Sequence, residues 1–113
     1  MQEAAFQKAL NALRATYLAA LPEKKTEIQK VMCDLQQQYD QTQLKKLEGL
    51  VHKLSGSGAM YGMDALGAQA RETEALIMQM QENNLIEDLH KEQLNAAITV
   101  LTSMMDDACQ RST

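Results

Sequence analysis

Hydrophobic positions recur at intervals of three and four along most of this chain, which is the spacing of one face of an α-helix. Five stretches show the pattern, and together they predict an all-α protein. Their stripe positions are Phe6, Ala9, Leu10, Leu13, Tyr17 and Ala20; Ile28, Val31, Met32, Leu35 and Tyr39; Leu44, Leu47, Val51 and Leu54; Leu66, Ala70, Thr73, Ile77 and Met80; and Leu94, Ala97, Ile98, Leu101, Met105 and Ala108.

The single proline, Pro22, separates the first two stretches. Proline has no backbone N–H and is tolerated in the first turn of a helix, where that donor has no partner within the helix. The sequence therefore predicts one helix over about 2–20 and a second helix that starts near residue 22.

Capping residues predict the other helix ends. Asp40 and Thr42 are candidate N-caps for the third helix, and Gly56 and Gly58 indicate that this helix ends or loosens there. The fourth stripe stops at Asn83–Asn84, and the segment Asn84–Glu87 has the form of a capping box that opens a short turn.

The connections between these helices are short, so neighbouring helices are expected to be antiparallel. The predicted fold is an up-down antiparallel four-helix bundle over 22–111 with an additional N-terminal helix, 1–21. That helix is expected to pack alongside the bundle or to cap one end. A chain of 113 residues fits one domain, 1–113.

Composition narrows the function classes. Five glycines and one proline are too few for the turns of an all-β protein. A net charge of −4 and a pI near 5.1 are unlike those of a nucleic-acid-binding protein. The longest unbroken apolar run, Tyr17–Leu21, is too short for a membrane span or a signal peptide. Cys33 and Cys109 lack metal-site spacing, which favours reduced thiols and a cytoplasmic location.

The segment around His52 is unusual for a helix in a bundle. At 100° per residue, the centre of the apolar stripe lies roughly 125° from His52, so the imidazole is expected to point outward. The positions within about 60° of it on the wheel are Lys45, Glu48, Gly49, Ser55, Gly56 and Ala59. Each helical glycine costs roughly 0.5–1 kcal/mol relative to alanine. Small neighbours on this face would let the surface of another protein approach the imidazole.

The pattern His52-x-Leu54-x-Gly56-Ser57, followed by Gly62, Leu66 and Glu74, resembles the signature of histidine-containing phosphotransfer (HPt) domains. The resemblance covers nearly the whole chain. It implies a four-helix bundle whose exposed histidine, here His52, accepts a phosphoryl group from a receiver-domain aspartate and passes it to another receiver. The implied partners are response-regulator receiver domains, with a hybrid sensor kinase as a further candidate.

A neutral imidazole is a competent nucleophile near pH 7, provided that one nitrogen keeps its proton. We hypothesise that Glu74 accepts a hydrogen bond from Nδ1–H of His52 and that Nε2 attacks. The family usually has a lysine three residues after the histidine, where this chain has Ser55. Ser55 is expected to donate a hydrogen bond there, or Lys45 or Lys53 to supply the positive charge.

The chain is expected to bind no cofactor or metal of its own, with Mg²⁺ arriving in the receiver partner. It has neither GxxxxGK[ST] nor GxGxxG, so we expect a phosphoryl carrier without an ATP site rather than an enzyme. The ends, Met1 and Arg111–Thr113, favour a free-standing protein, and we expect a monomer.

Three alternatives remain at this stage. Glu87–His90 spells ExxH, as in helical di-iron sites, but such sites need two copies of the motif. A non-catalytic helical adaptor that binds receiver or kinase domains is the second. In the third, as in chemotaxis, a separate kinase domain phosphorylates the bundle directly from ATP.

Overall fold

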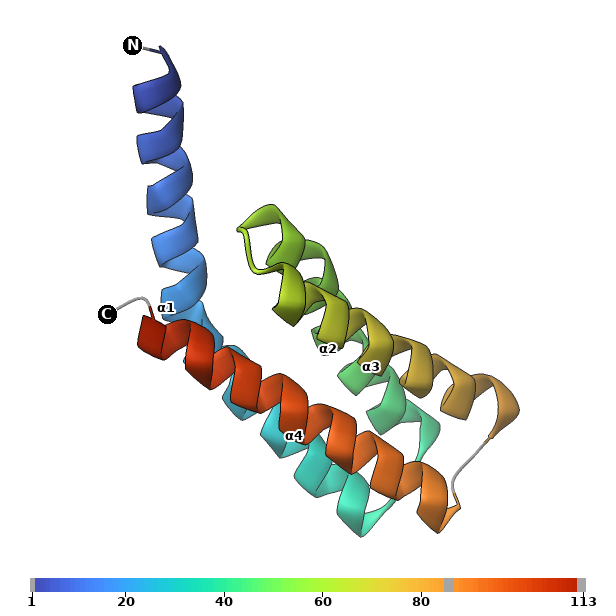
Figure 1. Ribbon diagram of the computed structural model, residues 1–113. Helices are drawn as coiled ribbons and strands as arrows, with labels where there is room; N and C mark the ends of the chain where they lie inside the picture. The colour runs from blue at the N-terminus through green and yellow to red at the C-terminus, as the bar shows by residue number, and fades with distance from the viewer. Residues whose placement is uncertain (1, 85–86, 112–113) are drawn as a thin grey trace.

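The computed structural model describes residues 2–84 and 87–111, which form four helices and no strand (Figure 1). They are α1 (Gln2–Gln37), α2 (Gln41–Met60), α3 (Asp64–Asn83) and α4 (Asp88–Arg111). Consecutive helices run in opposite directions (Figure 1). Helices α1 and α3 each pack against both α2 and α4, so the four helices form a closed bundle. The prediction of an all-α helical bundle is confirmed.

The predicted separate N-terminal helix, 1–21, is wrong, because α1 continues through Pro22 to Gln37. Proline inside a helix leaves the carbonyl four residues earlier without its N–H donor. Here that carbonyl belongs to Leu18, and the Cys109 thiol of α4 donates to it at 3.7 Å. Tyr17 and Leu21 are buried on the same side of the helix, while Pro22 faces solvent. Packing against the bundle therefore keeps the helix continuous where the local sequence favours a break, although α1 bends between its N-terminal part and the bundle (Figure 1).

The core lies where four of the five predicted stripes meet. The stripe residues that are buried there are Ile28, Val31, Met32, Leu35, Leu44, Leu47, Val51, Leu54, Leu66, Ala70, Thr73, Ile77, Met80, Leu94, Ile98, Leu101 and Met105. Leu44, Leu47 and Val51 have no exposed surface at all. Burying a side chain of this size is worth about 1.5–3 kcal/mol, so these stripes account for the assembly of the bundle.

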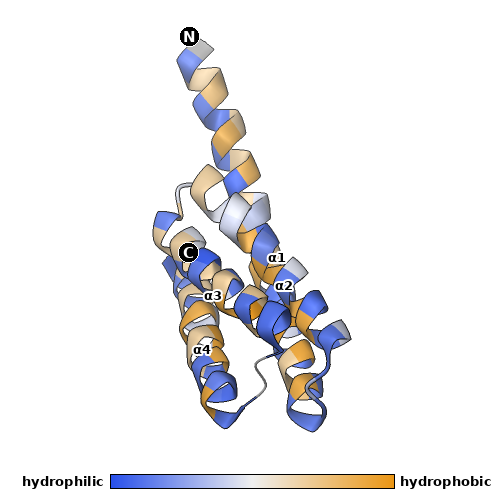
Figure 2. Cartoon of the chain, turned by 90° about the vertical axis from the view of Figure 1, so that its right-hand side faces the viewer, coloured by the Kyte–Doolittle hydropathy of each residue, from blue (hydrophilic) through white to orange (hydrophobic). Residues whose placement is uncertain are grey.

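The first stripe behaves differently. Residues 2–16 of α1, which we call the arm, extend past the ends of the other helices (Figures 1 and 2). At 1.5 Å per residue, a helix of 36 residues is about 54 Å long, close to the 56 Å length of the molecule. Phe6 and Leu13 are 70% and 55% exposed. The stripe was expected to pack on the bundle, but its residues on the N-terminal side of Tyr17 do not pack there.

The helix ends follow local chemistry in part. Asp40 is the N-cap of α2, and its side chain accepts from the Gln43 N–H at 2.8 Å, whereas Thr42 lies inside the helix. Helix α2 continues past the predicted end at Gly56 and reaches Met60. Gly62, with φ of 77°, turns the chain toward α3, a conformation that favours glycine.

The end of α3 was predicted at Asn83–Asn84 and lies there. Asn84 is its C-cap, with a left-handed φ of 50°, rather than the start of the next turn. The middle of the predicted capping box, Leu85 and Ile86, lies outside the described residues. None of the described helices has the length and apolar character that a membrane span requires.

Candidate functional site

His52 and Glu74 come together on the outer surface of the α2–α3 pair. The His52 side chain is 69% exposed, and that of Glu74, from the neighbouring helix, is 13% exposed. Nδ1 of His52 lies 2.6 Å from Oε2 of Glu74. The imidazole is thus held from one side by a largely buried carboxylate and is open to solvent on the other.

This contact assigns the tautomer of the imidazole. An ionised carboxylate only accepts hydrogen bonds, so Nδ1 carries the proton and donates it to Glu74. In the neutral ring the lone pair is then on Nε2. A short hydrogen bond to a charged acceptor is among the stronger ones in proteins, and it fixes the plane of the ring. The exposed nitrogen is therefore the nucleophilic one.

Two glycines bring α2 and α3 close enough for this contact. A Cβ on Gly58 would lie 2.8 Å from the backbone nitrogen of Gly67, and one on Gly67 would lie 3.2 Å from that of Ala59. The backbones of the two helices touch here, near the turn where the Met63 N–H donates to the Gly58 carbonyl at 2.7 Å. Glu74 lies two helical turns after Gly67 in α3. The close approach of the two helices therefore places Glu74 beside His52 of α2.

The pairing of Gly58 with Gly67 was not predicted from the sequence. Gly58 was interpreted only as a helix-end signal, and Gly67 was assigned no role. The available signal was a glycine inside each of two adjacent helical stripes, at similar distances from the turn at Gly62. Glycine disfavours helix interiors, so its presence in both helices indicates a close approach of their backbones.

Ser55 does not face the open side as the helical wheel suggested. It is 9% exposed, and its hydroxyl donates to the His52 carbonyl at 2.7 Å. The hydroxyl therefore serves the helix backbone, and the expectation that it donates to a phosphoryl group on His52 loses its geometric basis. Lys45 and Lys53 are both exposed on α2. They remain the candidate cations of this surface.

Gly49 and Gly56 flank His52 by one turn on either side, and a Cβ at either position would meet nothing within 4 Å. Packing among the residues that the structure describes therefore does not require glycine at either position. The glycines leave the backbone of α2 uncovered beside the imidazole, as expected for a surface that another protein approaches closely.

Tyr17 ties α1 to the end of α2. Its ring stacks on that of Tyr61 with centroids 4.8 Å apart, and its hydroxyl accepts from Ser57 at 3.1 Å. Burial raises the pKa of Tyr17; the hydrogen bond from Ser57 opposes this effect, and the neighbouring Tyr61 adds to it. The phenol is therefore neutral near pH 7.

Burial also raises the pKa of Tyr39. The Lys91 ammonium lies over the ring of Tyr39, 4.7 Å from its centroid.

The ExxH alternative lacks ligands. His90 lies in the first turn of α4, with Glu87 just before the helix. Within 2–84 and 87–111, no three His, Cys, Asp or Glu side chains gather as a ligand set. Nothing in the described residues therefore completes a metal site around His90.

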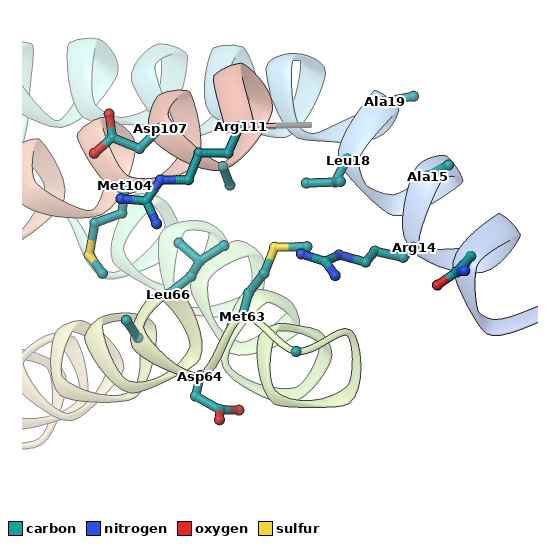
Figure 3. A pocket seen from close by; sticks show the side chains of 14 residues that line it. Arg14, Ala15, Leu18, Ala19, Met63, Asp64, Leu66, Met104, Asp107 and Arg111 are labelled. Atoms are coloured by element: carbon teal, nitrogen blue, oxygen red, sulfur yellow. The ribbon is translucent and has the colours of Figure 1, made fainter. Parts of the chain in front are cut away.

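A hollow in the surface lies away from His52. It measures about 780 Å³ and is bounded by the arm, the α2–α3 turn and the end of α4 (Figure 3). His52 is not among its lining residues; it stands on an open helical surface. Small molecules generally bind in concave sites, so this open site suits a protein partner.

A family model described as "Hpt domain" matches residues 12–111 of the chain, which is most of its length. Comparison with curated proteins and with solved structures returned no significant match.

Proposed function

Because the chain belongs to the Hpt domain family, we propose that it is a phosphorelay intermediate in which His52 accepts a phosphoryl group from a receiver-domain aspartate and passes it to another receiver. Phosphotransfer within phosphorelays is what the family as a whole performs. The observation that carries the assignment to His52 is the 2.6 Å contact of Nδ1 with Glu74, which leaves Nε2 exposed. Labelled transfer from a phosphorylated receiver domain tests the proposal.

The proposed step is a displacement at phosphorus. The Nε2 lone pair attacks the aspartyl phosphate of the receiver, the N–P bond forms as the P–O bond to aspartate breaks, and the aspartate leaves as a carboxylate. The ring then holds the proton on Nδ1 and the phosphoryl group on Nε2, and it carries a positive charge. The Glu74 carboxylate, already hydrogen-bonded to Nδ1, stabilises that charge. Attack by a second receiver's aspartate on the phosphorus reverses the step.

The remaining charge on the phosphoryl oxygens requires cations. Residues 41–60 contain three lysines and one glutamate, a local balance of +2 in a chain of net charge −4. We propose that Lys45 and Lys53 stabilise the phosphoryl group, and that Mg²⁺ arrives in the acidic pocket of the receiver. The chain offers no phosphate-binding glycine loop for ATP. It therefore acts as a carrier that depends on a phosphorylated partner, such as a hybrid sensor kinase.

The docking face is centred on His52 and includes Gly49 and Gly56. The complex is expected to be transient and its interface to be at the low end of the usual range of areas. The cytoplasmic location of receiver domains and the two thiols, Cys33 and Cys109, support a cytoplasmic location for this chain.

Replacing Glu74 is expected to slow transfer without unfolding the protein. Glu74→Ala removes the acceptor that fixes the tautomer, so the transfer rate should fall by about 10-fold or more. Glu74→Gln keeps a carbonyl that accepts from Nδ1–H, and its loss should be smaller. Rapid-quench measurement at saturating phosphorylated receiver gives both rates. Transfer at the wild-type rate by both variants would remove Glu74 from the mechanism.

Replacing Gly56 is expected to separate stability from partner binding. Gly56→Ala adds a methyl group into open space, so helix propensity should stabilise the fold by about 0.5–1 kcal/mol. The same methyl group stands on the docking face, and the dissociation constant for a receiver should rise severalfold. Thermal unfolding and titration calorimetry measure the two effects. Unchanged affinity would show that partners do not approach α2 closely at this position.

A further inference from the structure

The arm carries an apolar seam whose residues Phe6 and Leu13 do not pack against the core of the described residues. Phe6, Leu10, Leu13 and Tyr17 follow at intervals of four, three and four, the a/d spacing of a coiled coil. Tyr17 is buried against the bundle, whereas Phe6 and Leu13 are 70% and 55% exposed. Figure 2 shows the apolar residues of this helix continuing beyond the end of the bundle. The seam is therefore packed at Tyr17, half-buried at Leu10 and exposed at Phe6 and Leu13.

An open seam of this kind is costly to leave in water. A helix of about 15 residues is only marginally stable without tertiary contacts, and removing a large apolar side chain from water is favourable. Association through Phe6, Leu10 and Leu13 would supply tertiary contacts for the helix and would bury these side chains. A second copy of the chain presents the same seam, with the same spacing, and is the partner for which the two faces match by construction.

We propose that two copies of this chain associate through their arms, packed antiparallel about a two-fold axis. The antiparallel direction follows from where the seam points. The seam continues into Tyr17 and Leu21, which are buried against the bundle, so it faces the bundle side of α1. Parallel arms would place both bundles in the same space. Antiparallel arms place the second bundle beyond the tip of the first arm.

The surface next to the arm fits this arrangement. Met60, at the end of α2, is 69% exposed, and Met63 in the following turn packs partly against the core. The tip of the second copy's arm would reach this apolar end of the bundle. Its Glu3 would then lie near the hollow that Arg14 and Arg111 line together with Asp64 and Asp107 (Figure 3). The charges of this lining balance, so the apolar contact with Met60 and Met63 is what favours the arrangement.

The area available sets the strength of the association. A helix face about 22 Å long on each copy, together with the bundle end, amounts to on the order of 1,000 Å² in total, which is the lower bound for a specific interface. We therefore expect a dimer with a dissociation constant of about 1–100 μM. This proposal differs from the monomer expected from the sequence. His52 lies two helical turns from Met60 on the surface formed by α2 and α3, and it stays open in such a dimer.

Sedimentation equilibrium of the full chain tests the proposal over protein concentrations from about 1 μM to 1 mM. The weight-average mass is expected to rise from 12.6 kDa toward twice that value. Leu13→Glu places a charge in the seam and should hold the chain at the monomer mass. Ala12→Glu adds the same charge one residue earlier, on an exposed position about 130° from the centre of the seam, and should leave the dimer intact.

Two results would overturn the proposal. If the wild-type chain stays monomeric at all of these protein concentrations, the proposed dimer does not form. A dimer that survives in Leu13→Glu, and equally in a Phe6→Glu variant, forms through another surface. Circular dichroism of each variant verifies the fold.

Cysteine cross-linking tests the direction of the arms in a chain with Cys33→Ser and Cys109→Ser. Leu10→Cys lies near the middle of the seam and should form an intermolecular disulfide. Glu3→Cys should not, since antiparallel arms hold their tips apart. Equal cross-linking at both positions would contradict antiparallel packing.

Discussion

His52→Gln is expected to abolish phosphoryl transfer to this chain while leaving the fold intact. The His52 side chain is 69% exposed and belongs to no part of the buried core, so its replacement removes little packing. Glutamine has the length to keep a hydrogen bond with Glu74, but its amide nitrogen has no available lone pair for attack on phosphorus. Labelling should therefore fall to background, and the unfolding temperature should stay close to that of the wild type.

The measurement uses a receiver domain that carries radiolabelled aspartyl phosphate, mixed with the wild type or the variant. The wild-type product should be labile in acid and stable in alkali, as expected of phosphohistidine. His90→Gln is the matched control, because it removes the other histidine of the chain and should be labelled fully. Label that persists on His52→Gln would show that another residue accepts the phosphoryl group.

The same experiment separates the carrier from the adaptor. If the chain is an adaptor, the wild type and His52→Gln would bind the receiver with equal affinity, and neither protein would be labelled. A carrier takes label only when His52 is present. Binding measured beside transfer therefore distinguishes a receiver that does not recognise the chain from a chain that binds receivers without chemistry.

The buried positions followed from the sequence because they depend on local periodicity. Leu44, Leu47 and Val51 recur at helical spacing and are fully buried, and His52, off that stripe, is exposed. Periodicity failed where a contact from a distant part of the chain decides the outcome. Pro22 has no N–H to donate to the Leu18 carbonyl, and the thiol of Cys109 donates to that carbonyl instead. No pattern near Pro22 encodes that contact.

The site shows the same division. The outward direction of His52 came from the wheel, whereas the position of Glu74 beside it came from a family resemblance, since spacing along one chain does not say which faces of two helices meet. Ser55 lies only 60° from His52 on an ideal wheel, yet α3 packs closely enough on α2 to bury it. The pairing of Gly58 with Gly67 explains that closeness, and it is visible only in three dimensions.

Gly58→Ala is expected to be the most damaging small substitution outside the chemistry. The new methyl group would lie 2.8 Å from the backbone nitrogen and 2.9 Å from the Cα of Gly67. Backbone atoms do not move aside as a flexible side chain would, so α2 and α3 must separate. Overpacking of this kind costs about 1–3 kcal/mol, which corresponds to a fall of roughly 4–13 °C in the unfolding temperature. Transfer should also slow, because separation of the helices draws Glu74 away from His52.

Gly56→Ala is the matched control for this prediction, since it makes the same chemical change two residues earlier in the same helix. Its methyl group meets nothing within 4 Å, so the unfolding temperature should rise where that of Gly58→Ala falls. Opposite signs at two glycines half a turn apart would show that packing against α3, rather than helix propensity, governs position 58. A Gly58→Ala variant as stable as the wild type would mean that the α2–α3 backbone contact yields easily. The position of Glu74 would then need another cause.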